Sequence, residues 1–311
     1  MIPRPRPAAP SIGTVTLQVA NLALELRCAA GPAPVLPRVP YGPFLVPSGA
    51  PGPADAVVEV LDAEPVPPAG ESLYDTGDSW SVWRETDGLC FALRAGPDGP
   101  LLWTLRGAAP FARLRLDLAP RVRAGTAHGA GRGMLAYPLD QVLVLHLLAA
   151  RDGLLVHAAG VRVGDVGLAL AGPSGAGKTT LARTVGAAGG VEWLSDDRIA
   201  MRHQGPEITV SGTPWPGEAG IASATSAPLA AIGILRQGPT CRLTRLAPAE
   251  GLRRLLPTLS VPWYLRDLAD RALATVDTIL ARTPVFEVML DRDPRAVRDS
   301  VLRALPAAVG R

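Results

Sequence analysis

Residues 172–179 read GPSGAGKT, a spacing of glycine, lysine and threonine that is suited to phosphate binding. The glycines allow the backbone to turn so that successive N–H groups converge on phosphate oxygens, and a following helix would add its positive N-terminal end. Lys178 would contact the β and γ phosphates, and the Thr179 hydroxyl would bind Mg²⁺. We therefore predict a nucleotide site made of Gly172, Pro173, Ser174, Gly175, Ala176, Gly177, Lys178, Thr179 and Thr180. The alternative is a glycine turn with a structural role.

The lysine of this motif has no counterpart elsewhere in the chain. Lys178 is the only lysine among the 31 lysine and arginine residues. An ammonium is a compact charge on a flexible stem, and it fits between two phosphates where a planar guanidinium is too broad. The exception therefore lies where phosphate chemistry requires lysine.

Two adjacent carboxylates, Asp196 and Asp197, follow an apolar stretch beyond the glycine loop. A carboxylate at the end of a strand beside a phosphate site can hold Mg²⁺ through water, or accept a proton from an attacking hydroxyl. Neighbouring residues of a strand point to opposite sides, so we expect one carboxylate in the site and the other against a nearby loop. The alternative is a solvated turn in which Arg198 is the partner of the pair.

Two further side chains could take part in the chemistry. His157 lies on the apolar stretch that precedes the loop and could approach the γ phosphate or order the aspartates, although a histidine on such a strand can also be a core residue. Arg236 follows the apolar stretch 229–235 and could reach the charge that develops on a transferred phosphoryl group. Its alternative is a surface cation at a strand end.

The elements around the loop are predicted from apolar periodicity. Residues 154–163 and 166–171 form two β-type runs joined by Gly164-Asp165, which predicts an antiparallel hairpin that leads into the loop. The ordinary βαβ unit joins such strands through a helix, so the hairpin indicates a different branch of phosphate-loop proteins. We also expect helices at 138–151, 178–188, 248–256, 264–282 and 295–305, and strands at 191–195, 198–201, 208–211, 229–235 and 285–290.

The region before the loop has the pattern of a β-rich domain. Short alternating stretches at 14–26, 56–61, 80–85, 89–95 and 101–107 are divided by proline and glycine. Trp80 and Trp83 would lie on opposite faces of a regular strand, which favours packing on two sides over a shared ligand platform. Residues 124–133, rich in glycine and alanine, form the expected linker between a domain at 1–125, to which we assign no chemistry, and a catalytic domain at 134–311.

The composition excludes several classes of protein. With 311 residues, 48% hydrophobic and 19% charged, the chain is predicted to be globular. The pI is near 9.0, but the basic residues are scattered among acidic ones, so we expect no nucleic-acid partner. Cys28, Cys90 and Cys241 lie far apart and are interpreted as reduced thiols. The longest apolar run, 142–150, contains His146, interpreted as a core residue, and is too short to cross a membrane. Without an apolar signal segment, we expect a cytoplasmic location.

Together, Val156-His157, the loop GPSGAGKT and the stretch LSDDR at 194–198 resemble the HPr kinase/phosphorylase family over roughly residues 135–240. The family's catalytic domain is a P-loop fold related to phosphoenolpyruvate carboxykinase. The resemblance implies that His157 is an active-site residue, Lys178 a phosphate ligand, Thr179 a magnesium ligand and Asp197 the proton acceptor for a substrate serine. It also implies that Glu218 corresponds to the family's metal-binding glutamate.

The chain departs from the family in the IRGxGI run, in the C-terminal phosphorylase segment and in the N-terminal region, none of which it shares. It looks closer to HPr kinase-like proteins found beside peptide-modification genes, including kinases of lasso-type precursor peptides. The expected fold is α/β, with a mixed-sheet P-loop kinase domain of HPr kinase/phosphoenolpyruvate carboxykinase type and a β-rich N-terminal region.

The expected function is an ATP-dependent kinase that acts on a serine-type hydroxyl of a peptide or small protein. The catalytic residues would be His157, Lys178, Asp196, Asp197 and Arg236, and the metal ligands for Mg²⁺ would be Thr179, Asp196 and Glu218. Two alternatives remain, an ATP-binding regulatory or assembly protein and a kinase of a small metabolite. Self-association is left open.

Overall fold

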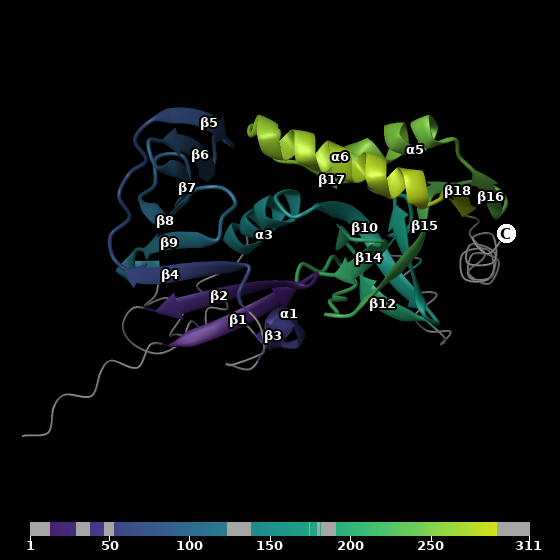
Figure 1. Cartoon of the computed structure of the whole chain (residues 1–311), viewed down its shortest axis with the longest axis horizontal. Coiled ribbons are helices and arrows are strands. Elements are labelled where there is room, and N and C mark those ends of the chain that lie inside the picture. The colour runs from purple at the N-terminus through teal and green to yellow at the C-terminus, as the bar shows by residue number, and fades with distance from the viewer. Residues whose placement is uncertain are drawn as a thin grey trace, which may run out of the picture. The chain divides into compact units, whose positions relative to one another are not determined.

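The computed structural model describes residues 13–28, 38–46, 53–122, 138–173, 175–178, 181 and 191–290 (Figure 1). The predicted linker at 124–133 and helix at 295–305 lie outside these residues, as does most of the helix predicted at 178–188. The chain divides into two units, of which unit 1 holds most residues up to Asp140 and unit 2 most residues from Gln141 on. The domain boundary predicted between residues 125 and 134 falls outside the described residues and stays a prediction.

Unit 1 contains one mixed β-sheet of nine described strands in the order β3-β1-β2-β4-β9-β8-β7-β6-β5. Its elements are β1 (Thr14–Val19), β2 (Leu22–Cys28), the short helical turn α1 (Arg38–Tyr41), β3 (Leu45–Val46), β4 (Ala56–Asp62), β5 (Glu71–Asp75), β6 (Trp80–Glu85), β7 (Gly88–Arg94), β8 (Leu101–Gly107) and β9 (Arg113–Leu118). Strand β4 pairs in parallel with β2 and β9. The strands predicted at 56–61, 80–85, 89–95 and 101–107 are confirmed within one residue.

Two details of this sheet refine the predictions. The alternating stretch 14–26 is divided into β1 and β2 by Ala20 and Asn21, which both have positive φ angles, of 52° and 58°. Such a pair of residues suits the tight turn between antiparallel strands. Trp80 packs against the ring of Tyr74 at 5.0 Å between centroids, whereas the Trp83 Nε1 donates to Ser81 Oγ at 2.9 Å. The two indoles therefore have separate partners, as expected for packing on two sides.

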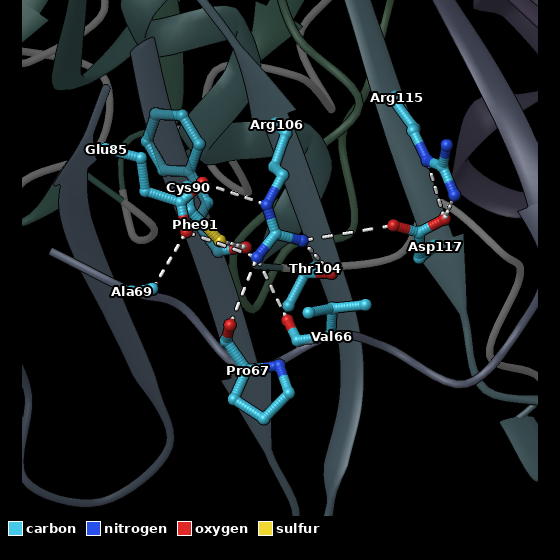
Figure 2. A network of polar contacts seen from close by, with 10 residues as sticks. All are labelled: Val66, Pro67, Ala69, Glu85, Cys90, Phe91, Thr104, Arg106, Arg115 and Asp117. Carbon is cyan, nitrogen blue, oxygen red and sulfur yellow. Dashed lines mark hydrogen bonds and ion pairs between the residues drawn. The ribbon is translucent and has the colours of Figure 1, made fainter. Parts of the chain in front are cut away.

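A polar network centred on Arg106 of β8 ties a loop segment to the sheet of unit 1 (Figure 2). The guanidinium donates to the Glu85 carboxylate at 2.9 and 3.2 Å, to Thr104 Oγ1 at 2.9 Å, and to the carbonyls of Val66 and Pro67 at 3.0 and 3.3 Å. Burial raises the pKa of Glu85, but the hydrogen bonds from Arg106 and from the Ala69 N–H, together with the charge of Arg106, outweigh this effect and lower the pKa. Because Nε, Nη1 and Nη2 of Arg106 all donate to groups of this chain, we assign this side chain a structural role.

Unit 2 is built on a second mixed sheet with helices against it (Figure 1). Its helical elements are η1 (Gly42–Phe44), α3 (Leu139–Ala149, whose first two residues fall in unit 1), α5 (Pro248–Leu255), η2 (Leu256–Thr258) and α6 (Arg266–Arg282). Its strands are β10 (Gly153–Val163), β11 (Val166–Ala171), β12 (Glu192–Ser195), β13 (Arg198–Gln204), β14 (Glu207–Gly212), β15 (Ser226–Gln237), β16 (Arg242–Arg245), β17 (Leu259–Ser260) and β18 (Val285–Leu290). The described chain is thus a mixed α/β structure dominated by two mixed sheets.

The connectivity of unit 2 follows the predictions closely. Strands β10 and β11 form the expected antiparallel hairpin, with Val163 opposite Val166 and a positive φ of 60° at Gly164. The strands predicted at 198–201 and 208–211 are β13 and β14, which form a second antiparallel hairpin, and α3, α5, α6, β12, β15 and β18 all occur where the apolar pattern predicts them. Pairings run from β10 to β11, β15, β14, β13 and back to β10, which closes a ring. The short strands β16 and β17 were not predicted.

The core of unit 2 surrounds β11. Residues 167–171 are buried, and β11 is a central strand, with antiparallel β10 on one side and parallel β15 on the other. Leu168 and Leu170 pack with Leu235 and Val288 in this core. An unbroken apolar run, in place of alternation, is the pattern of a strand covered on both faces.

His146 is a core residue, as predicted. Its side chain is fully buried in α3, with Nδ1 2.6 Å from the Val142 carbonyl oxygen and Nε2 3.2 Å from the Tyr264 hydroxyl. Burial lowers the pKa of His146 to about 4, so the ring is neutral at neutral pH. Among the described residues, no helix is both long enough and apolar enough to span a membrane.

Candidate functional site

Strand register places His157 beside the start of the glycine loop. Ala158 of β10 is opposite Ala171, the last residue of β11, so His157 is the next residue of β10 where the loop begins at Gly172, and both residues line one cleft. On its other side β10 pairs with β13, where His157 is opposite Arg198. A histidine that is distant in sequence from both neighbours is therefore fixed between the loop and the residues that follow the aspartates.

The loop has the backbone conformation that its glycines allow. Gly175 and Gly177 have φ angles of +78° and +102°, a region that side chains with a Cβ rarely adopt. A Cβ on Gly172 would lie 2.9 Å from Ala176 Cβ and 3.1 Å from the Leu235 carbonyl oxygen, so this position requires glycine for space. The Leu181 N–H donates to the Gly177 carbonyl at 2.8 Å, as at the start of a helix. Ser174, Thr179 and Thr180 lie outside the described residues, and their roles stay predictions.

The Lys178 ammonium is held by the loop itself. Its Nζ donates to the carbonyl oxygens of Gly172 at 2.7 Å and Pro173 at 3.2 Å, and the residue is 7% exposed. Burial lowers the pKa of Lys178, the nearby Asp197 carboxylate raises it and Arg198 lowers it further, with a net decrease. The Lys178 ammonium and the Asp197 carboxylate are therefore close enough to interact electrostatically.

Asp197 lies between a histidine and an arginine. His157 Nδ1 is 3.0 Å from Asp197 Oδ1, off the line of a hydrogen bond, and Arg198 Nε is 3.4 Å from Oδ2. About a third of each side chain of the His157–Asp197 pair is exposed. Burial lowers the pKa of His157, the Asp197 carboxylate opposes this, and the Lys178 and Arg198 cations add to the decrease. The imidazole is therefore neutral at neutral pH. Asp197 thus contacts His157, as the catalytic hypothesis expects, and also Arg198, the partner expected in the alternative of a solvated turn.

Asp196 faces the opposite way, as the alternation of side chains predicts. It is 2% exposed and accepts the backbone N–H groups of Gly217 at 2.9 Å, Ala219 at 2.7 Å and Ile221 at 3.2 Å. These bonds shape the loop 217–221, on which Glu218 is exposed. They also use most of the acceptor capacity of the carboxylate. Among the described residues, no three histidine, cysteine or acidic side chains form a cluster suited to a metal, and the metal roles of Asp196 and Glu218 stay predictions.

Two polar residues at the end of β15 frame the other side of the loop. Arg236 pairs with Glu287 at 3.2 Å and keeps 57% of its side chain exposed. Gln237 Nε2 donates to the Gly175 carbonyl at 2.7 Å and so fastens the loop to β15. Gln237 was not predicted from the sequence. Its place beside the loop follows from the parallel pairing of β11 with β15, which was also not predicted.

A cleft of about 680 Å³ opens beside the loop. It is lined by His157, Gly172, Pro173, Ile234, Leu235, Arg236, Arg253, Arg254, Pro257 and Thr258. None of these described lining residues is acidic, whereas three are arginines. Arg253 and Arg254, at the end of α5, were predicted only as part of a helix. The cleft therefore joins the candidate histidine and the start of the loop to a cationic wall.

Comparison with known proteins adds little to this geometry. No family model matches the chain, and no curated protein matches it. Among solved structures, the HPr(Ser) kinase/phosphatase from Coxiella burnetii is similar over 50% of this chain and 90% of that chain. The identity is 12% and the TM-score 0.25, values that describe a distant resemblance, and we transfer no residue role from that structure.

Proposed function

We propose that the chain is an ATP-dependent kinase that transfers the γ phosphate to a serine-type hydroxyl of a peptide or small protein. The supporting observation is the convergence of the Lys178 ammonium, the glycine loop and the His157–Asp197 pair around the C-terminal end of β11, beside the middle of β10. Phosphoryl transfer to a hydroxyl requires a phosphate-binding loop beside a group that can accept a proton. The proposal agrees with the resemblance of these motifs to the HPr kinase/phosphorylase family.

The loop fits the phosphates of a nucleotide. Gly172 leaves space that a Cβ would fill, and the left-handed conformations of Gly175 and Gly177 can turn N–H groups toward an anion. Lys178 would exchange the carbonyls of Gly172 and Pro173 for phosphate oxygens, because negatively charged phosphate oxygens attract an ammonium more strongly than two neutral carbonyls do. The loop would thus hold the reacting phosphate near His157.

Asp197 would accept the proton of the acceptor hydroxyl at Oδ1. The neutral imidazole of His157, 3.0 Å away, leaves the charge of this carboxylate in place and limits its orientation. Arg198, on the other oxygen, also donates to Ser260 Oγ at 3.3 Å and so holds the pair against β17. Lys178 and Arg236 would stabilise the negative charge that spreads over the phosphoryl group during transfer.

Mg²⁺ would supply charge neutralisation between phosphate oxygens when bound. Thr179, Asp196 and Glu218 are its predicted protein ligands. Asp196 already accepts three backbone N–H groups, so its contribution would be made through water or through the loop 217–221 that it shapes. The chemistry of the described donors therefore suits a metal held mainly by phosphate and water, as is usual for Mg²⁺ at phosphates.

The proposal is tested with Asp197→Asn, with Asp165→Asn as the matched control because Asp165 lies fully exposed in the β10–β11 turn. We expect D197N to bind ATP as the unaltered protein does but to lose phosphoryl transfer by about 10²- to 10⁴-fold, measured with labelled ATP, Mg²⁺ and a panel of serine peptides. Lys178→Ala should lose ATP binding. ATP hydrolysis without label on any peptide would contradict the proposal and favour the regulatory ATP-binding alternative.

A further inference from the structure

Five charged side chains beside the glycine loop alternate in sign. Arg253 donates to Glu250 at 2.7 and 2.8 Å, Arg254 pairs with both Glu250 and Glu287, and Arg236 pairs with Glu287 at 3.2 Å. The hydrogen bond from Arg253, followed by that from Arg254, lowers the pKa of Glu250 to about 2. The hydrogen bond from Arg254 lowers the pKa of Glu287 as well, so both glutamates are ionised at neutral pH. Three arginines and two glutamates leave a net charge of +1 on this cluster.

The arginines, and not the glutamates, are among the described residues that line the cleft. Their exposed fractions differ, since 71% of the Arg253 side chain and 57% of the Arg236 side chain are exposed, against 23% for Arg254. The two glutamates hold Arg254 firmly between them. Arg253 has free N–H capacity on an exposed guanidinium, because Glu250 occupies only its Nε and Nη2.

The cationic wall lies in the same cleft as His157 and the first two residues of the glycine loop. Its remaining lining is largely apolar, with Ile234, Leu235 and Pro257. A volume of about 680 Å³ is within the range that holds a segment of a few residues or a drug-sized molecule. His157, 3.0 Å from Asp197, lines this cleft together with Arg253, so a segment that presents its hydroxyl to Asp197 can extend to Arg253 on α5.

We propose that Arg253, supported by Arg254, binds a carboxylate of the phosphoryl acceptor, so that the preferred acceptor is a hydroxyl flanked by aspartate or glutamate. This inference rests on the proposed kinase function and names the chemical class of its acceptor. A guanidinium binds a carboxylate through two parallel N–H donors, which gives geometry as well as attraction. The acceptor is thus an acidic peptide segment, and Arg253 is a residue that determines specificity.

The test compares serine peptides that differ only in flanking Glu or Gln residues. Binding is measured by fluorescence anisotropy in the presence of a non-hydrolysable ATP analogue, and transfer is measured separately with ATP. We expect the acidic peptide to bind about three- to tenfold more tightly, a range that takes account of the exposure of Arg253, with a smaller difference at high salt. R253Q should remove the difference and R253E should favour a lysine-flanked peptide, whereas R266Q, on the exposed face of α6, should change nothing.

The two readouts separate the inference from the proposed function. Equal binding of acidic and neutral peptides to the unaltered protein would overturn the acidic-acceptor inference, even if both peptides were phosphorylated. A weaker affinity of R253Q for ATP alone would assign the arginine to the nucleotide and would also overturn it. Preferential binding of the acidic peptide without any transfer would support the acceptor site and contradict the kinase function.

Discussion

The hydrogen bond from Gln237 to the glycine loop is expected to contribute measurably to the proposed nucleotide binding. Gln237 Nε2 donates to the Gly175 carbonyl at 2.7 Å, and the bond is exposed. Gln237→Ala removes the donor, but water can reach the carbonyl, so the loss is that of an ordinary hydrogen bond, about 0.5–1.5 kcal/mol. Because the bond fixes the loop and not the core, we expect this loss to appear as a Kd for ATP raised about 2- to 12-fold.

Isothermal titration of ATP and hydrogen exchange at residues 175–178 provide the assay. Q237A should show weaker binding and faster exchange in the loop, with an unchanged unfolding midpoint. Q237E should bind more weakly still, since a carboxylate cannot donate to Gly175 and repels phosphate. Gln204→Ala, at the exposed end of β13, is the control. If Q237A bound ATP as tightly as the unaltered chain and its loop exchanged at the same rate, the assigned role of Gln237 would be refuted.

Two further predictions concern stability. The pKa of His146 is about 4 in the folded chain and about 6.5 in an unfolded chain, so the unfolded chain binds more protons between these pH values. The free energy of unfolding therefore falls as pH is lowered, by about 3 kcal/mol in all. Urea denaturation at several pH values should show that the free energy of unfolding of His146→Gln depends less steeply on pH, and the same dependence in both proteins would contradict the assignment. Arg106→Met should lower the free energy of unfolding by about 1–3 kcal/mol, because Glu85 and two carbonyls lose a partly buried donor. Arg84→Met, at an exposed pair, should lower it by less than about 0.5 kcal/mol. Equal losses for the two variants would contradict the structural role of the Arg106 network.

Elements with a strong local signal could be predicted from sequence. The hairpin that leads into the loop follows from two apolar runs around Gly164-Asp165, and the short strands of unit 1 follow from alternation between proline and glycine breaks. The opposite directions of Asp196 and Asp197 follow from the geometry of adjacent residues. Strand β5 has no comparable signal, since its residues are largely exposed and do not alternate.

Contacts between segments far apart in the chain could not be predicted in the same way. Gln237 reaches Gly175 only because β15 lies parallel to β11, and one sequence does not specify which strands pair. No local sequence pattern separates Arg253 from the many other arginines of the chain, and its position in the cleft depends on how α5 packs. Likewise, the bonds from Gly217, Ala219 and Ile221 to Asp196 depend on a loop whose backbone has no periodic pattern.

The two hydrogen bonds that Lys178 makes to loop carbonyls set a minimum interaction energy that an anion must supply in order to bind. Its ammonium already has two carbonyl acceptors from Gly172 and Pro173, so an entering anion must replace both bonds, each worth about 1.5–3 kcal/mol for a charged donor. Chloride, with a single diffuse charge, gives little in exchange, whereas the adjacent charges of a di- or triphosphate can replace both acceptors at once. We therefore expect the loop to exclude the most abundant small anions and to bind a polyphosphate, as the proposed function requires.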